Sequence, residues 1–183
     1  GEALLWAHNR LIARPEVIEA PIGGETTRLD CRDTSAKREA FAVMQSWLRS
    51  LPSHAEVNRT VTHLCRRHGL DDSAMAHELC MSWTELQTFG ADPLVTIGAH
   101  TLSHCNIAKC SSEEAEREIA TSRANIEAKL DRPAMHFAYP YGDKGAAGAR
   151  DFAIARKLGF RTAVTTRPGM LNAENADHMT ALA

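Results

Sequence analysis

Three short apolar segments, separated by helical patterns, dominate the second half of the chain. They are residues 94–99, 136–139 and 161–166, and their composition is that of buried strands. Strands that alternate with helices through short connections form right-handed parallel βαβ units. We therefore predict an α/β fold in which residues 93–183 form a βαβαβ arrangement.

The first half of the chain, residues 1–92, has mostly helical periodicity. One helix is expected to begin at Thr34 or Ser35 and to end near Ser50, and Thr26–Cys31 has the composition of a short strand. Serine followed three residues later by glutamate is a capping box, which marks a helix start. Two such pairs are present: Ser82 with Glu85, and Ser111 with Glu114.

Composition excludes several classes of protein. The 21 basic and 23 acidic residues give a net charge of −2, which is not the charge of a general nucleic-acid-binding protein. No apolar run approaches the roughly 20 residues that span a bilayer, so we expect no transmembrane segment. The five cysteines are odd in number and form no C-x-x-C pair, which indicates free thiols and favours a reducing compartment.

The first residues, Gly1 to His8, do not resemble a signal peptide, because they lack a basic segment and a long apolar stretch. They have the pattern of the middle of an amphipathic helix. We therefore expect coding sequence before Gly1 to be missing from this chain.

Polar segments follow each predicted strand. These segments are His100–His104, Pro140–Asp143 and Arg167–Gly169. Functional groups of parallel α/β folds lie beyond the carboxyl ends of the strands. The three segments are therefore expected to share one rim.

His100 and His104 are the most specific feature of that rim. Placed on one helical turn, residues four apart present their side chains on the same face, and neutral imidazole is the commonest metal ligand. Thr101 stands where the H-E-x-x-H zinc proteases have glutamate, so that class is not indicated. The hydroxyls of Thr101 and Ser103 are expected to support the loop or a ligand ring from behind. The alternative is a structural or exposed histidine pair.

The segment from Phe137 to Gly142 contains both tyrosines of the chain. In an extended segment Phe137, Tyr139 and Tyr141 would line one face, and such a face could pack a sugar ring. The alternative is a core strand that ends in a Pro-Tyr-Gly turn.

Together these segments resemble the polysaccharide deacetylases, carbohydrate esterase family 4, which includes the nodulation chitooligosaccharide deacetylases. IGAHTLSH is similar to the family's H-[ST]-x-x-H metal motif, and FAYPYGD is similar to its third motif. The resemblance covers about residues 79–171.

The resemblance implies a metal-dependent N-deacetylase on a distorted, TIM-like (β/α) barrel, which here would be incomplete. Such an enzyme is a hydrolase of non-peptide C–N bonds in an acetylated glycan. His100 and His104 would bind a divalent ion, usually zinc, and the backbone N–H of Tyr141 would hold the oxyanion. Tyr139, Pro140, Tyr141 and Arg167 would contact the substrate.

Two departures from the family pattern affect this interpretation. The third metal ligand and the catalytic base are aspartates of a T-F-D-D-G motif, which this sequence lacks. Ala138 stands at the position of an arginine that orients the catalytic aspartate, and Arg167 is a candidate replacement. His178 lies near the region of the family's general acid, but its surroundings do not match that motif.

Three functions remain open. The first is an N-deacetylase of chitooligosaccharides or other N-acetylglucosamine polymers, of which this chain would be an inactive fragment, because catalytic zinc needs three protein ligands. The second is a non-catalytic carbohydrate-binding or scaffold version of the fold. The third is hydrolysis of small amides or esters. The helical segment 1–92 would cover the substrate groove or form the dimer surface of a homo-oligomer.

Overall fold

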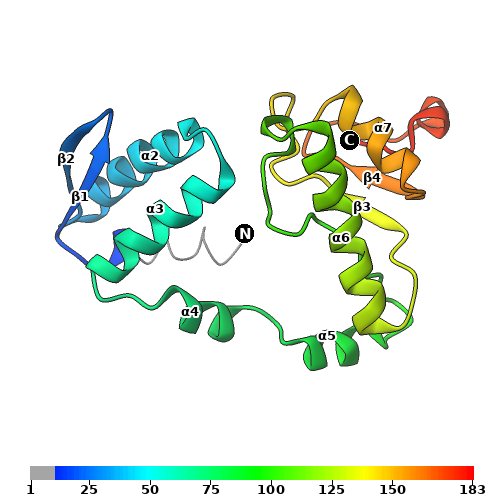
Figure 1. Cartoon of the computed structure of the whole chain (residues 1–183), viewed down its shortest axis with the longest axis horizontal. Helices are drawn as coiled ribbons and strands as arrows, with labels where there is room; N and C mark the ends of the chain where they lie inside the picture. Colours follow the sequence, from blue (N-terminus) through cyan, green and yellow to red (C-terminus); the bar gives the residue numbers. More distant parts are fainter. Residues whose placement is uncertain (1–10) are drawn as a thin grey trace. The chain divides into compact units, whose positions relative to one another are not determined.

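The computed structural model describes residues 11–183, apart from the side chains of Asp72, Ser73, Met75 and Ala76. The chain divides into two compact units, Gly1–Cys80 and Met81–Ala183 (Figure 1). The division falls twelve residues before the boundary expected from the sequence, so that the helix that follows Ser82 belongs to the second unit. Within the described residues, no helix is long and apolar enough to cross a membrane.

The first unit contains a β-hairpin that lies beside a helix (Figure 1). Strands β1 (Val17–Ile22) and β2 (Glu25–Asp30) pair antiparallel, and Gly23 and Gly24 form the turn with φ of 67° and 88°. Left-handed backbone of this kind favours glycine. The short strand predicted near residue 26 is confirmed as β2, whereas β1 was not predicted.

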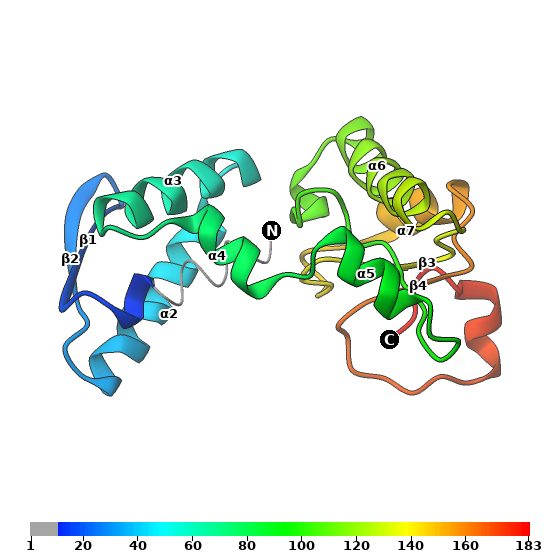
Figure 2. The same cartoon turned by 90° about the horizontal axis from the view of Figure 1, so that it is seen from below.

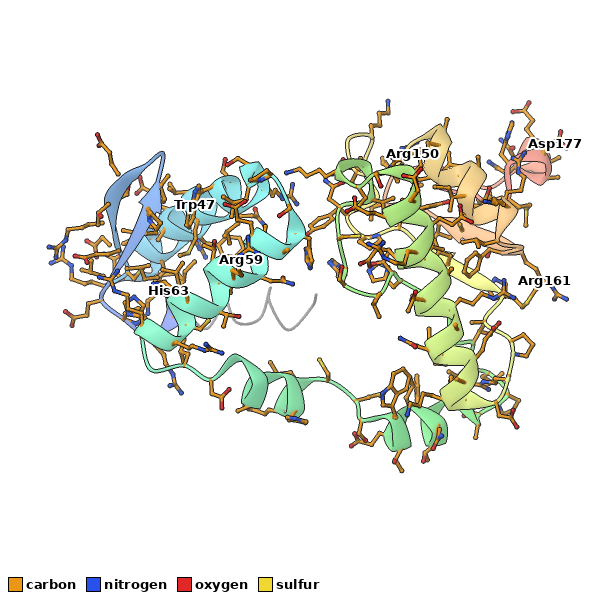
Figure 3. All side chains as sticks on the ribbon, in the orientation of Figure 1. Trp47, Arg59, His63, Arg150, Arg161 and Asp177 are labelled. Carbon is orange, nitrogen blue, oxygen red and sulfur yellow. The ribbon has the colours of Figure 1, made fainter. Side chains whose placement is uncertain are left out.

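Three helices follow the hairpin in the first unit: α2 (Thr34–Ser50), α3 (His54–Arg67) and α4 (Asp72–Leu79). The cap of α2 is Asp33, not Thr34 or Ser35, because its carboxylate accepts from the Ala36 N–H at 2.9 Å. Buried side chains of the hairpin, α2 and α3 form one core, and Trp47, labelled in Figure 3, packs against it.

The second unit contains three α-helices and two short 3₁₀ helices. They are α5 (Trp83–Gly90), η1 (Ile107–Lys109), α6 (Ser112–Leu130), α7 (Ala149–Lys157) and η2 (Ala173–His178). Both predicted capping boxes are confirmed, at the starts of α5 and α6. Figure 2, like Figure 1, places α6 alongside α7, and the two helices are in contact.

Parallel strand pairing organises the second unit. Strand β3 (His136–Ala138) pairs parallel with β4 (Thr162–Val164). Single parallel bridges extend the array on both sides, from Ala99 to Phe137 and from Val164 to Leu182. Four parallel segments therefore lie side by side in chain order. The predicted α/β class and parallel direction are confirmed, but the expected first strand is reduced to the bridge at Ala99.

A buried cluster lies against one face of this array. The side chains of Phe137 and Ala163 point into it, where they meet α6 and α7. Side chains alternate across a strand, so Ala138, Thr162 and Val164 belong to the opposite face. An open pocket lies on that face and extends to His100.

Candidate active site

Two loops meet at the carboxyl end of the parallel segments. The loop after Ala99 carries His100 and His104, whose ring centroids are 4.8 Å apart. The loop after β3 carries Tyr141, whose ring centroid is 5.3 Å from that of His104. The structure therefore brings together His100, His104 and Tyr141, which belong to the two sequence motifs.

The histidine pair does not lie on a helical turn. Residues 100–104 form a bend, in which Thr101 and His104 have φ of 64° and 59°. These two left-handed residues turn the chain sharply, so the rings meet through a tight loop. The two histidine rings are close together, as predicted. The prediction that a helical turn brings them together is wrong.

Backbone strain is concentrated at this site. Within residues 11–183, four non-glycine residues have positive φ, and three of them are Thr101, His104 and Tyr141. A β-branched residue such as Thr101 is especially costly in this conformation. Strained backbone of this kind persists where surrounding structure enforces it, and it gathers at functional sites.

A backbone carbonyl orients the ring of His100. The Nδ1 atom of His100 lies 2.7 Å from the carbonyl oxygen of Ala138. A carbonyl oxygen only accepts hydrogen bonds, so in the neutral ring Nδ1 is the protonated nitrogen and Nε2 carries the lone pair. This is the arrangement of a metal-ligating histidine, whose second nitrogen is fixed by a hydrogen bond.

A carboxylate from α6 holds the loop between the histidines. Ser103 donates to Glu118 twice, from its backbone N–H at 2.9 Å and from its hydroxyl at 3.0 Å. The backbone carbonyl of Glu118 also accepts from the Leu102 N–H at 3.1 Å. Ser103 was predicted to support the loop, and the residue that it contacts there is Glu118. Nothing in the local sequence pattern around Glu118 indicated that role.

Thr101 lies between the two histidines with a buried hydroxyl. Its Oγ1 atom has no hydrogen-bond partner in the described part of the chain. A buried hydroxyl without a partner is costly, so this atom is available to a ligand or a bound water. Its predicted support of the loop stays a prediction.

Tyr139 and Pro140 are placed in the core. The ring of Tyr139 is 2% exposed, and its hydroxyl donates to the carbonyl oxygen of Thr180 at 2.7 Å. Burial raises the pKa of Tyr139. The positive φ of Tyr141 turns its ring out of the row that Phe137 and Tyr139 begin, so the expected three-ring face does not form.

Arg167 contacts the segment around the start of α7. Its guanidinium donates to the carbonyl oxygen of Ala147 and lies 5.2 Å from the centroid of the Phe152 ring. The carbonyl contact anchors the side chain just before α7, and the cation–π contact anchors it on α7 itself. The expected contact of Arg167 with the substrate stays a prediction.

The site contains two side chains of the type that zinc prefers as ligands. The Nδ1 contact of His100 leaves Nε2 as the nitrogen that could coordinate an ion, and the ring of His104 is its neighbour. Within residues 11–183, no group of three histidine, cysteine, aspartate or glutamate side chains could hold an ion. The described residues thus fit part of a zinc site and leave its third ligand unassigned.

Comparison with known families agrees with this geometry. Residues 58–163, more than half of the chain, match the family model described as polysaccharide deacetylase. The chain belongs to the polysaccharide deacetylase family. The match includes both site loops and begins within α3 of the first unit. A search of curated proteins found no match.

Three solved structures are similar to this chain, and the first of them shares its fold. The Streptococcus pyogenes deacetylase PplD, solved in complex with acetate, is 16% identical with a TM-score of 0.51, over 68% of this chain and 56% of that one. The polysaccharide deacetylase BC0361 from Bacillus cereus is 20% identical (TM-score 0.49, 56% and 31% covered). The deacetylase domain of BpsB from Bordetella bronchiseptica is 16% identical (TM-score 0.49, 58% and 48% covered). This polysaccharide deacetylase chain therefore spans little more than half the length of PplD.

Proposed function

We propose that this chain carries part of the active site of a metal-dependent N-deacetylase. The substrate class is an acetylated glycan, with chitooligosaccharides and other N-acetylglucosamine polymers as the expected members. The observation that supports the proposal is the meeting of His100, His104 and Tyr141 at the carboxyl end of parallel strands. The fixed Nδ1 of His100 adds to it, because that hydrogen bond prepares the other nitrogen for a metal.

His100 and His104 would hold a divalent ion, for which zinc is the expected choice. When bound, such an ion polarises an acetamide carbonyl and lowers the pKa of a bound water to about 7. The family's third ligand is an aspartate that the described residues do not supply. We therefore propose that the 183-residue chain alone has little or no deacetylase activity.

The chain's own residues position the reaction. The Ala138 carbonyl holds the His100 ring, and Glu118 holds the loop that carries His104 through Ser103. The backbone N–H of Tyr141 is proposed to donate to the oxyanion that forms at the acetamide carbon. Its exposed ring, beside His104, is proposed to contact the sugar.

A carbohydrate-binding protein without catalysis is the second candidate. It is favoured by Ala138, which stands where the resemblance leads us to expect arginine, and by the incomplete ligand set within residues 11–183. The two candidates share the glycan and differ in acetate release.

The test measures zinc-dependent acetate release from N-acetylglucosamine oligomers. It compares the 183-residue chain with the longest product of its gene, each with zinc and after chelation. In the longer product, His104→Ala is expected to reduce the rate by about 100-fold or more, because ligand loss removes the metal. The matched control is His63→Ala, on α3 in the first unit and labelled in Figure 3.

Each outcome separates the candidates. A wild-type rate in His104→Ala would contradict the metal assignment. Rapid turnover by the 183-residue chain would contradict the proposal that a third ligand is needed. Oligomer binding by the longer product without acetate release would favour the carbohydrate-binding protein.

A further inference from the structure

Two cysteines face each other in the loop that follows the candidate site. The Sγ atoms of Cys105 and Cys110 are 3.7 Å apart, with η1 between them in the chain. Cys105 comes directly after His104. The proposed deacetylase chemistry uses neither thiol.

The loop that carries the two thiols is firmly anchored. Arg150, at the start of α7 and labelled in Figure 3, donates to the carbonyl oxygens of Ile107 and Cys110, each at 2.7 Å. The Ala108 N–H donates to the Ala146 carbonyl at 3.2 Å. The side chain of Ile107 is fully buried. These contacts hold the sulfur atoms near each other without a disulfide bond between them.

The two thiols differ in access to solvent. Cys105 is 2% exposed, whereas Cys110 is of intermediate exposure. A dissolved oxidant therefore reaches Cys110 first. Cys105 is placed to react with an oxidised form of Cys110, because the two sulfur atoms are already in contact.

We propose that Cys105 and Cys110 form a reversible redox pair whose reaction partner is a low-molecular-weight disulfide such as oxidised glutathione. The Cys110 thiol gives its proton to solvent, and its sulfur attacks one glutathione sulfur. The glutathione S–S bond breaks, and one glutathione leaves as thiolate. Cys105 then loses its proton and attacks the Cys110 sulfur of the mixed disulfide, which releases the second glutathione. Two protein thiols are oxidised and one glutathione disulfide is reduced.

Formation of the bond requires a small local movement. The sulfur atoms must approach from 3.7 Å to about 2.05 Å. The bond closes a short loop around η1. The inference is independent of the proposed function, because it needs neither metal nor glycan.

The experiment uses the full chain with Cys80→Ser, which removes the exposed cysteine. The protein is incubated with oxidised glutathione, quenched with an alkylating agent and mapped by mass spectrometry. We expect a peptide pair that joins Cys105 to Cys110, a loss of two titratable thiols, and full reversal by dithiothreitol. Absence of that link, with or without glutathione on Cys110, would overturn the proposal.

Two further variants test the order of attack. In the same background, Cys105→Ser is expected to keep glutathione on Cys110, because the second thiol is absent. Cys110→Ser is expected to take up none at Cys105, which is buried. Glutathione on Cys105 in the folded Cys110→Ser variant would contradict the assigned order. Far-UV circular dichroism checks that each variant is folded. The disulfide mapping in the Cys80→Ser protein tests the proposal even if these two variants do not fold.

Discussion

The Nδ1 atom of His100 lies 2.7 Å from the carbonyl oxygen of Ala138, across the first parallel bridge of the second unit. The strand pairing that brings Ala99 beside Phe137 thus also fixes the ring of His100. Because the acceptor is a backbone atom, no side-chain substitution at Ala138 removes it. The orientation of His100 is therefore a property of the fold.

This contact predicts the tautomer of His100. The neutral ring should carry its proton on Nδ1, since a carbonyl oxygen cannot donate. Long-range ¹H–¹⁵N correlation spectra, assigned by comparison with His100→Gln, measure this directly. His136 is the contrasting case, because its Nδ1 lies 2.7 Å from the Thr162 hydroxyl, which can donate or accept. A proton on Nε2 of neutral His100 would show that the Ala138 contact is not formed.

Features with local causes were predictable from the sequence. The capping boxes at Ser82 and Ser111 form because the two partners are three residues apart and need nothing else. The meeting of His104 with Tyr141 was predictable in outline, because the carboxyl ends of parallel strands share an edge.

Features set by tertiary contacts were not predictable in the same way. The bend at Thr101 depends on contacts with α6 that lie far along the chain, among them those of Glu118. The alternation that should align Tyr141 with Tyr139 fails because the backbone becomes left-handed at Tyr141. Neither the capping pattern nor the strand pattern carries information about such positions.

Glu118 is predicted to control the loop that carries His104. Glu118→Ala removes both acceptors of Ser103, and hydrogen bonds to a charged group are worth about 1.5–3 kcal/mol. We expect amide hydrogen exchange at Ser103 to accelerate by about tenfold or more.

The matched control for Glu118 is Glu116→Ala on the same helix. Glu116 pairs with Lys157 at the surface, at 2.8 Å, and such pairs contribute about 0–1 kcal/mol. Exchange at Ser103 should stay unchanged in this variant. Equal acceleration in both variants would indicate general loosening of α6 and would contradict the specific role of Glu118.

Gly142 is predicted to set the position of Tyr141. It has φ of 62°, and a Cβ atom there would lie 2.6 Å from the backbone nitrogen of Thr166. Gly142→Ala should therefore push the loop away from the segment that follows β4 and remove the contact between the Tyr141 and His104 rings. Nuclear Overhauser effects between the two rings measure that contact.

Gly69→Ala is the matched control for Gly142→Ala. Gly69 has φ of 69°, but a Cβ atom at that position would meet no atom within 4 Å beyond its chain neighbours. The control thus carries the left-handed backbone cost of about 1–2 kcal/mol without the collision. Ring contacts should persist in Gly69→Ala, and their persistence in Gly142→Ala would show that the loop tolerates a side chain there.

Tyr139 is predicted to stabilise the second unit. Tyr139→Phe removes the buried hydroxyl and leaves the Thr180 carbonyl without that donor, at a cost of about 1–3 kcal/mol. Because Thr180 precedes the bridge at Leu182, we expect the last residues to loosen, with faster proteolysis there and a lower midpoint of thermal unfolding. Tyr141→Phe is the comparison, since its exposed ring predicts a smaller effect on unfolding. If Tyr139→Phe matched wild type in both measurements, while weakening oligomer binding, Tyr139 would act on the substrate as the sequence motif indicates.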